Sequence, residues 1–260
     1  TCATTLVSIG AATVAGNTYA WSPSAGLSAN NIAQPNATAP GTYTLTVTNI
    51  TNGCTATDAV TISQNIVVPT ANAGANQTLT CSNPSLAIGT VAIVGNTYIW
   101  SPSSGLSANN IAQPSATSPG TYTLTVTNTA NGCTATDAVT ISQNITPPIA
   151  NAGTNQTLTC ATTSVSIGAV AVSGKTYSWS PNIGMSAKSN GQSNATVAGT
   201  YTVTVRNTAN GCTATDAVTI SQNITPPLAN AGTNQTLTCA NTSVSIGTAA
   251  VVGNTYIWSP

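Results

Sequence analysis

Seven cysteines recur at a fixed interval along this 260-residue chain and divide it into repeats. The interval is 79 residues within each of two series, Cys2, Cys81, Cys160 and Cys239, and Cys54, Cys133 and Cys212. The same interval separates the tryptophans Trp21, Trp100, Trp179 and Trp258, and the aspartates Asp58, Asp137 and Asp216. A period of this length indicates one folding unit used repeatedly, here about three and a third times.

The boundaries between repeats are expected at three segments that contain proline, IVVPTANAG (66–74), ITPPIANAG (145–153) and ITPPLANAG (224–232). This division gives a first repeat that lacks its first strand (1–66), two complete repeats (67–145 and 146–224) and the N-terminal part of a further repeat (225–260). Because both ends of the sequence fall inside a repeat, we expect the natural chain to continue in both directions.

The pattern inside a repeat is typical of β-strands. In TYTLTVTN (121–128), Tyr122, Leu124 and Val126 alternate with threonine, which predicts a strand with one buried face. NTYIW (96–100), QTLTC (77–81) and SLAIG (85–89) alternate in the same way, and no stretch has a helical period. We predict an all-β fold of small sandwiches with about seven strands each, joined in a linear rod or fibre. The predicted core includes Trp21, Trp100, Trp179, Trp258, Tyr43, Tyr122 and Tyr201.

Composition excludes several classes of function. The chain has three basic and three acidic residues and no histidine, so it lacks the basic surface that nucleic-acid binding requires. There is no apolar run of about 18 residues to span a membrane. Paired carboxylates, a catalytic triad and a metal-ligand cluster are also missing from the sequence. We therefore expect no enzymatic activity, no catalytic or metal site and no cofactor.

The repeat resembles the PKD-like, immunoglobulin-type repeats found in tandem in very large surface proteins of adhesive and gliding bacteria. The resemblance is carried by ANAGTNQTLTC (150–160), SVSIG (164–168), TYSWSP (176–181), GLSANNIAQPSAT (105–117), GTYTLTVTN (120–128) and NGCTATDAVTI (131–141). It covers the whole chain and implies tandem immunoglobulin-like sandwiches in a secreted array at the cell surface, used as a stalk, spacer or adhesive fibre. The third repeat departs from the pattern at NIGMSAKSNGQSNATVAG (182–199).

The cysteines are interpreted as structural disulfides, which small secreted domains commonly need. The favoured pairs lie within repeats, Cys2–Cys54, Cys81–Cys133 and Cys160–Cys212, with the partner of Cys239 outside the chain. Each bridge would connect the end of the first strand to the start of the last one, near one end of a sandwich. The alternative pairs, Cys54–Cys81 and Cys133–Cys160, would connect neighbouring repeats across a proline-bearing segment.

The repeated aspartate presents a conflict. In CTATDAVTI (133–141), Asp137 has the same parity as Val139 and Ile141, so a regular strand would direct its carboxylate toward the core. Burial of an unpaired charge is unfavourable. Two explanations remain open: a bulge shifts the register near Asp137, or the carboxylate accepts hydrogen bonds from backbone N–H or hydroxyl groups. We expect Asp58, Asp137 and Asp216 to have this structural hydrogen-bonding role.

The predicted function is that of a structural repeat array in an extracellular, cell-surface stalk or filament. Prolines in the connecting segments favour extended, semi-rigid backbone, and the scarcity of charge removes repulsion between neighbouring arrays. We therefore expect the repeats to associate with one another and with lateral copies in a fibre. The alternative is an adhesin module that binds a ligand, such as a surface glycan, through the variable loops 24–40, 103–119 and 182–199.

Overall fold

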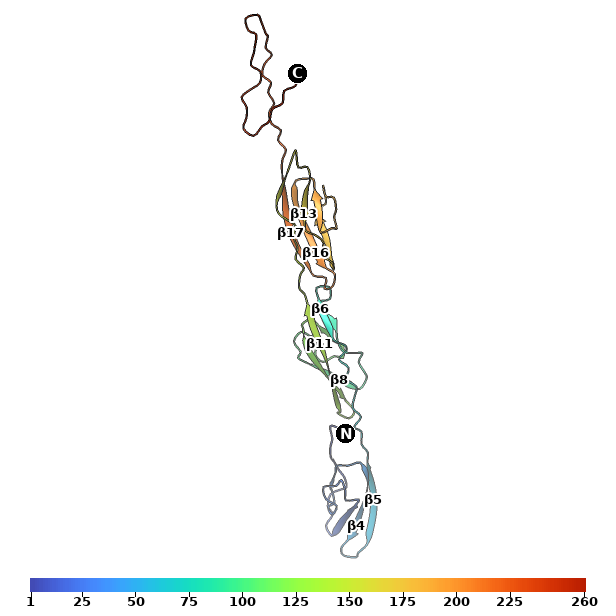
Figure 1. The fold of residues 1–260 in the computed structure, drawn as a ribbon. Coiled ribbons are helices and arrows are strands. Elements are labelled where there is room, and N and C mark those ends of the chain that lie inside the picture. Colours follow the sequence, from blue (N-terminus) through green and yellow to red (C-terminus); the bar gives the residue numbers. More distant parts are fainter. The chain divides into compact units, whose positions relative to one another are not determined.

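The computed structural model describes residues 1–260, which form β-strands connected by turns and loops (Figure 1). The chain divides into two compact units, residues 1–146 and 147–260. The first unit contains the first two repeats, and the second contains the third repeat and the residues after it. No helix is present that could cross a membrane.

The second repeat shows the complete architecture. Its strands are β6 (Gln77–Thr80), β7 (Leu86–Ala87), β8 (Asn96–Ser101), β9 (Ser115–Ala116), β10 (Gly120–Asn128) and β11 (Thr134–Asn144). One sheet has the order β6-β11-β10-β8, and β7 pairs with β9 in a second, smaller sheet. The first strand, β6, runs parallel to the last, β11, and the other pairs are antiparallel. The repeat is thus an immunoglobulin-like β-sandwich, and the predicted all-β fold class is confirmed.

The core lies between the two sheets and follows the predicted alternation. Tyr122, Leu124 and Val126 of β10 are buried, and Val139 and Ile141 of β11 lie beside them in the same cluster. The threonines between them face outward, because successive side chains of a strand point to opposite faces.

Trp100 occupies the centre of this core and is 1% exposed. Its indole Nε1 donates a hydrogen bond to the carbonyl of Ile111 at 2.9 Å, which fixes the loop after β8 over the core. The Tyr122 hydroxyl donates to the carbonyl of Ser118, four residues upstream, at 2.9 Å. This bond is the tyrosine corner of immunoglobulin-like domains, in which the ring fills the core while its polar end is satisfied by the backbone.

The third repeat has the same arrangement. Its strands are β12 (Gln156–Thr159), β13 (Val165–Gly168), β14 (Lys175–Ser180), β15 (Gln192–Ala195), β16 (Gly199–Asn207) and β17 (Thr213–Asn223). The larger sheet has the order β12-β17-β16-β14, and β13 pairs with β15. Trp179 and Tyr201 are buried in its core.

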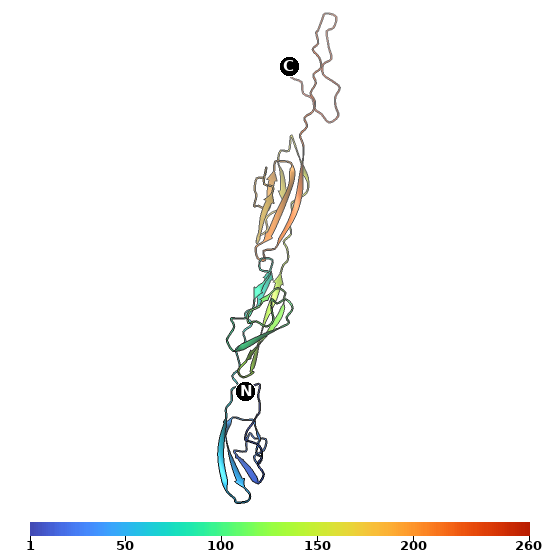
Figure 2. The same ribbon diagram turned by 180° about the vertical axis from the view of Figure 1, so that it is seen from behind.

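The first repeat has no counterpart of β6. Its strands are β1 (Val7–Ser8), β2 (Asn17–Ser22), β3 (Asn36–Ala37), β4 (Gly41–Asn49) and β5 (Thr55–Ile62). The larger sheet has only three strands, in the order β2-β4-β5. Trp21 and Tyr43 are still buried, but Leu45, Val60 and Ile62 are only partly covered. Both ribbon views place the N-terminus at the end of this repeat that adjoins the second repeat (Figures 1 and 2).

Three details differ from the sequence-based expectations. Each complete repeat has six strands, and SLAIG contributes only the two residues of β7. The alternation of QTLTC (77–81) would direct Leu79 and Cys81 to the same buried face, but β6 ends at Thr80 and Cys81 is exposed. Trp258 was predicted to lie in a core, yet it is 57% exposed. Residues 224–260 form no strand, since they contain no equivalent of β10 and β11 with which to build a sheet.

Candidate functional site at the junction of the first two repeats

A disulfide bond connects the first repeat to the second. Cys2 lies in the N-terminal segment of the first repeat, and Cys133 directly precedes β11 of the second. Their Cα atoms are 4.9 Å apart although 131 positions separate them in the sequence. Cys133 is 1% exposed.

The predicted pairing within repeats is therefore wrong. Cys133 is bonded to Cys2, which excludes Cys2–Cys54 and Cys81–Cys133, and Cys160 is a free thiol, which excludes Cys160–Cys212. The alternative pairs Cys54–Cys81 and Cys133–Cys160 fail for the same reasons, since Cys54 is also free. Cys239 is the third free thiol. Cys81 and Cys212, which follow Cys2 and Cys133 by one repeat, are both disulfide-bonded.

The physical reason for the error is the direction of the first strand. Because β6 runs parallel to β11, Gln77 pairs with Ile141 and Thr80 with Asn144. Cys81 therefore lies beside the end of β11, whereas Cys133 lies before its start. The 11 residues of β11 separate them by about 35 Å at 3.3 Å per residue. A repeat thus has one cysteine at each end, and a bond of 2 Å cannot connect them.

Asn131 holds the two repeats together next to the disulfide. Its side chain is 2% exposed, and its Nδ2 donates hydrogen bonds to Asn65 Oδ1 and to the carbonyl of Val67, both at 2.9 Å. Its Oδ1 accepts from the backbone N–H of Cys133, and its carbonyl accepts from the N–H of Ala3 at 3.1 Å. The turn before β11 is thereby bonded to both segments of the first repeat that reach the junction.

Gly132 permits the close approach of these segments. A Cβ atom added to Gly132 would lie 2.5 Å from the Cβ of Ala3, and its backbone has φ of +72°. No side chain other than hydrogen fits between the two repeats at this point. The Asn-Gly-Cys sequence therefore has three separate roles: hydrogen bonding, close contact and covalent linkage.

The first repeat contains the same turn without a neighbour and provides an internal control. Asn52 Oδ1 accepts from the N–H of Cys54 at 3.0 Å, as Asn131 Oδ1 does from Cys133. Both Asn52 and Cys54 are nevertheless exposed. The turn forms by itself, so the burial of Asn131 and Cys133 results from the contact with the first repeat.

The repeated aspartate attaches the connecting segment to the sandwich. Asp137 Oδ2 accepts a hydrogen bond from the N–H of Ala73 at 2.8 Å, and Asp216 Oδ2 accepts the equivalent bond from Ala152 at 2.8 Å. The pairing of β10 with β11 is continuous past Asp137, which lies opposite Leu124, so of the two explanations left open the bulge is excluded. The prediction of a backbone hydrogen bond is confirmed. Asp58 bonds only the N–H of its neighbour Ala59.

The connecting segment is fixed by further bonds to the second repeat. Asn72 Oδ1 accepts from the N–H of Gly74 at 2.9 Å, and Gly89 donates to the carbonyl of Ala73 at 2.9 Å. Asn76 Oδ1 accepts from the N–H of Thr140 on β11 at 2.8 Å. Ala73 itself is fully buried. The ANAG sequence that recurs in the chain is therefore part of the sandwich.

One of the variable mid-repeat loops borders a depression in the surface. In the third repeat an open, polar depression of about 300 Å³ is lined by Ser166, Ser186, Ala187, Asn190, Gln192, Ser193 and Asn194. It contains no charged side chain, and the structure brings no three His, Cys, Asp or Glu side chains together as metal ligands.

The sequence pointed to Cys133 and Asp137. It did not indicate that Asn131 forms hydrogen bonds across the junction with Ala3, Asn65 and Val67. The Asn-Gly pair is typical of a turn, and nothing in its composition distinguishes a free turn from a buried one. The cysteine spacing was the signal that could have indicated this junction. An interval of 79 residues is compatible with a disulfide to the next repeat as well as with one inside a repeat.

Comparison with known proteins finds no matching family model and no matching curated protein. Among solved structures, immunoglobulin domains 1–5 of Sidekick-1 align over 84% of this chain and 57% of their own, at 13% identity and a TM-score of 0.33. Three N-terminal domains of the bacteriophage RB49 Highly Immunogenic Outer Capsid protein align over 80% and 89%, at 13% identity and a TM-score of 0.33. The titin fragment I67–I69 aligns over 84% and 92%, at 11% identity and a TM-score of 0.34. All three TM-scores are below 0.5, so these alignments identify neither a family nor a function for this chain.

Proposed function

We propose that the chain is a structural repeat array that carries tension along an extracellular, cell-surface stalk or filament. The observation that supports this proposal is the Cys2–Cys133 disulfide, which joins successive repeats. Disulfides of this kind persist in oxidising compartments, which favours an extracellular location. The array would consist of the repeats 1–66, 67–145 and 146–224, followed by residues 225–260 as the start of a further repeat.

The disulfide changes the covalent path along which force travels. Tension applied at Thr1 passes from Cys2 directly to Cys133 and then along β11 into the next connecting segment. Residues 3–132 lie outside this path. If they unfolded, the closed loop would still add no length, whereas without the bond the sequence separation of 131 between Cys2 and Cys133 would extend to roughly 430–470 Å. A stalk built in this way resists extension without needing very stable domains.

The contacts around the disulfide suit the same role. Asn131, Ala3 and Asn65 form hydrogen bonds on both sides of the bridge, so the repeats are also held non-covalently. The aspartate bonds of Asp137 and Asp216 fasten each connecting segment to the sandwich that follows it. The junction is therefore a short, bonded connection.

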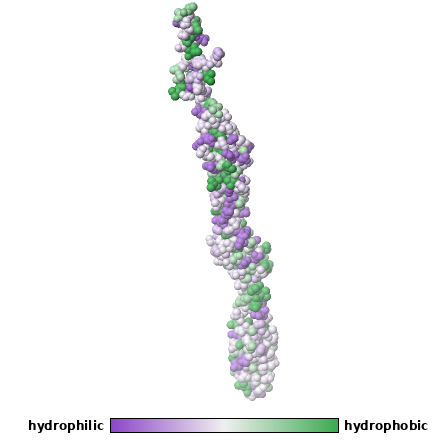
Figure 3. Space-filling view, in the orientation of Figure 1, coloured by the Kyte–Doolittle hydropathy of each residue, from purple (hydrophilic) through white to green (hydrophobic).

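We also propose that the array associates with copies of itself. The surface has few charges, and Figure 3 shows separate apolar areas on it. Among the apolar side chains, Val94 is fully exposed, and Val91 and Ile149 are largely exposed. Weak mutual repulsion and small apolar contacts favour packing of many arrays together.

A single protease cut tests the role of the disulfide. A recognition sequence inserted between Val68 and Pro69 separates the first repeat from the second in the backbone, and neither residue takes part in the hydrogen bonds of Asn131. After cleavage, the two fragments should remain one band on a denaturing gel without reductant and separate when reductant is added. The Cys2→Ser variant is the matched control and should separate in both cases. Separation of the unreduced parent fragments would contradict the proposal.

A further inference from the structure

Asparagine precedes glycine at several places in the chain, and these asparagines differ in exposure. Asn131 and Asn210 are 2% and 1% exposed, although each lies in a turn. Asn190, in the variable loop of the third repeat, is exposed. An Asn-Gly pair is the sequence in which an asparagine amide reacts most readily with its own backbone, because glycine has no side chain to hinder the approach of its nitrogen. The burial of Asn131 therefore has a chemical consequence as well as a structural one.

The reaction converts the side-chain amide to a carboxylate. The backbone nitrogen of glycine attacks the asparagine Cγ, a new C–N bond closes a succinimide ring, and the bond from Cγ to Nδ2 breaks. The proton of the attacking nitrogen leaves with the amide as ammonia. Water then opens the ring at either carbonyl group, which gives aspartate or isoaspartate. The sum is one water consumed and one ammonia released, with no oxidation or reduction.

Hydrogen bonds fix the leaving amide of Asn131. Its Nδ2 donates to Asn65 Oδ1 and to the carbonyl of Val67, both at 2.9 Å. Its Oδ1 accepts from the N–H of Cys133, also at 2.9 Å. Rotation of the side chain toward the backbone nitrogen of the next residue breaks these bonds. Attack on Cγ therefore needs the side chain to leave its acceptors in the segment after β5.

The attacking nitrogen is held as well. The Gly132 N–H, which must lose its proton to attack, donates to the carbonyl of Asn128 at 2.8 Å. Gly132 also lies against Ala3, where an added Cβ would be 2.5 Å from the Ala3 Cβ. The Ala3 N–H donates to the carbonyl of Asn131 at 3.1 Å. The two reacting groups are thus fixed apart on a backbone that has no room to move.

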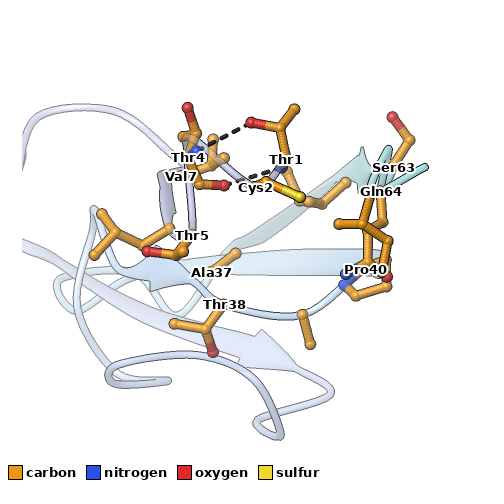
Figure 4. A pocket seen from close by; sticks show the side chains of 14 residues that line it. Thr1, Cys2, Thr4, Thr5, Val7, Ala37, Thr38, Pro40, Ser63 and Gln64 are labelled. Carbon is orange, nitrogen blue, oxygen red and sulfur yellow. Dashed lines mark hydrogen bonds between the residues drawn. The ribbon is translucent and has the colours of Figure 1, made fainter. Parts of the chain in front are cut away.

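The first repeat also keeps water from Asn131. Two of its segments form the cover, and Figure 4 shows them side by side, with Thr1 and Cys2 on one and Ser63 and Gln64 on the other. The disulfide joins this cover to Cys133, two residues after Asn131. Ring closure and hydrolysis therefore both require the junction to open.

We propose that Asn131 is a deamidation site controlled by the junction, inert while the first repeat covers it and reactive when the junction opens. The Cys2–Cys133 bond suppresses the reaction, because a tethered contact re-forms at a high effective concentration. Asn190 has no such cover and reacts freely. The inference goes beyond the tension-bearing role proposed above and does not depend on it.

Neither product fits the closed junction. Aspartate loses both donated bonds and places its carboxylate against Asn65 Oδ1 and the Val67 carbonyl. Isoaspartate adds a carbon to the backbone before Gly132, where no space remains beside Ala3. A junction that has opened and reacted does not close again in the same form. Deamidation of Asn131 is therefore a one-way change that records opening of the junction.

The third repeat has the same local arrangement. Asn210 Oδ1 accepts from the N–H of Cys212 at 3.0 Å, and Gly211 donates to the carbonyl of Asn207 at 2.8 Å. Asn210 is therefore a buried reference, and Asn190 is an exposed one, for the reaction at Asn131 within a single chain.

The test follows the three pairs in the full chain by peptide mass spectrometry during incubation at mildly alkaline pH. Asn190 should react at least about tenfold faster than Asn131 and Asn210, because the buried sites react only through local opening. Cys2→Ser should raise the rate at Asn131 by at least about tenfold and leave Asn190 and Asn210 unchanged. Cys54→Ser removes a free thiol and is the matched control, with no effect on any of the three rates.

A second variant opens the junction without changing a cysteine. Ala3→Leu places a larger side chain against Gly132, so it should also raise the rate at Asn131. Hydrogen exchange of the β10 amides reports whether the second sandwich stays folded, and the rate at Asn131 should rise while this protection is retained.

A third measurement addresses the one-way character of the change. Chains are incubated with reductant and returned to a glutathione redox buffer, and chains with and without Cys2–Cys133 are separated. Aspartate and isoaspartate at position 131 should be enriched roughly tenfold or more in the chains without the bond.

Three results would each overturn the proposal: equal rates at Asn131 and Asn190 in the parent chain, a rate at Asn131 that neither Cys2→Ser nor Ala3→Leu raises, or equal modification of bonded and unbonded chains. The protease cut between Val68 and Pro69 reads only the disulfide, so its result stays informative in each case.

Discussion

At the scale of single residues, Asn131 shows how one side chain can serve a turn and an interface together. Its Oδ1 caps the turn that leads into β11, and its Nδ2 reaches two acceptors in the first repeat. Asn52 makes the first kind of bond alone. The difference between the two positions isolates the contribution of the amide nitrogen to the junction.

Asn131→Asp should weaken the junction while keeping the turn. The carboxylate still accepts from the Cys133 N–H, but it loses both donated bonds and faces Asn65 Oδ1 and the Val67 carbonyl, which is unfavourable by about 1–3 kcal/mol. In a glutathione redox buffer, the equilibrium constant for forming Cys2–Cys133 should fall by roughly 10- to 100-fold. Asn52→Asp should leave it unchanged, and equal effects of the two substitutions would contradict the assignment.

Asp137→Ala should destabilise the second repeat by about 1–2 kcal/mol, because it removes a charge-assisted hydrogen bond to the buried Ala73 segment. Hydrogen exchange of peptides from residues 67–145 measures this loss. Asp58→Ala is the control, and its effect on the first repeat should be smaller, since Asp58 bonds only Ala59. Protection in the second repeat that is unaffected by Asp137→Ala would exclude the proposed fastening role.

The sequence allowed much to be predicted at this scale, with a clear limit. The hydrogen bond of Asp137 followed from the conflict between its parity and its charge, and the buried Tyr122 and Trp100 followed from alternation and size. The partner of Cys133 did not follow, because it depends on where a strand from another part of the chain ends. Local sequence specifies a turn or a buried face, but it does not specify what packs against the turn.

At the scale of secondary-structure elements, the parallel pairing of β6 with β11 determines the organisation of the array. It places the two cysteines of a repeat at opposite ends of one sheet, which directs covalent bonds between repeats. The strands β8, β10 and β11 were predicted well from their period, and β7 was predicted too long. The direction of β6 relative to β11 could not be predicted, because period-2 alternation is the same for parallel and antiparallel strands.

The connection after β7 provides a test of packing at this scale. Gly89 has φ of +79°, and a Cβ there would lie 2.1 Å from the Ala112 carbonyl oxygen and 2.9 Å from the Trp100 ring. Gly95 has φ of +84° and no atom within 4 Å. Gly95→Ala should therefore show only backbone strain of about 1 kcal/mol. Gly89→Ala adds a steric clash with the core and should be more destabilising by at least about 2 kcal/mol.

Thermal or urea unfolding, followed by the fluorescence of Trp100 in a chain whose other tryptophans are replaced by phenylalanine, compares the two variants. Similar losses of stability would show that the tight contact of Gly89 with Ala112 and Trp100 has no energetic importance.

At the scale of the whole molecule, covalent connectivity matters more than the stability of a single repeat. The disulfide places residues 3–132 in a closed loop, so extension of the chain does not depend on whether the first repeat remains folded. The 79-residue period predicted the array, the alternation of apolar and polar residues predicted the all-β class, and the cysteines predicted the presence of disulfides. It could not decide between linkage within and between repeats, because the two arrangements share the same spacing and differ only in three dimensions.

The most direct test of this account is single-molecule stretching of a chain held at Thr1 and at Pro260. All cysteines except Cys2 and Cys133 are replaced by serine, so that one bond determines the result. Reduction should increase the fully extended length by roughly 430–470 Å, the contour that corresponds to the sequence separation of 131 between Cys2 and Cys133. The same extended length before and after reduction would contradict the central claim that this disulfide carries tension past the first two repeats.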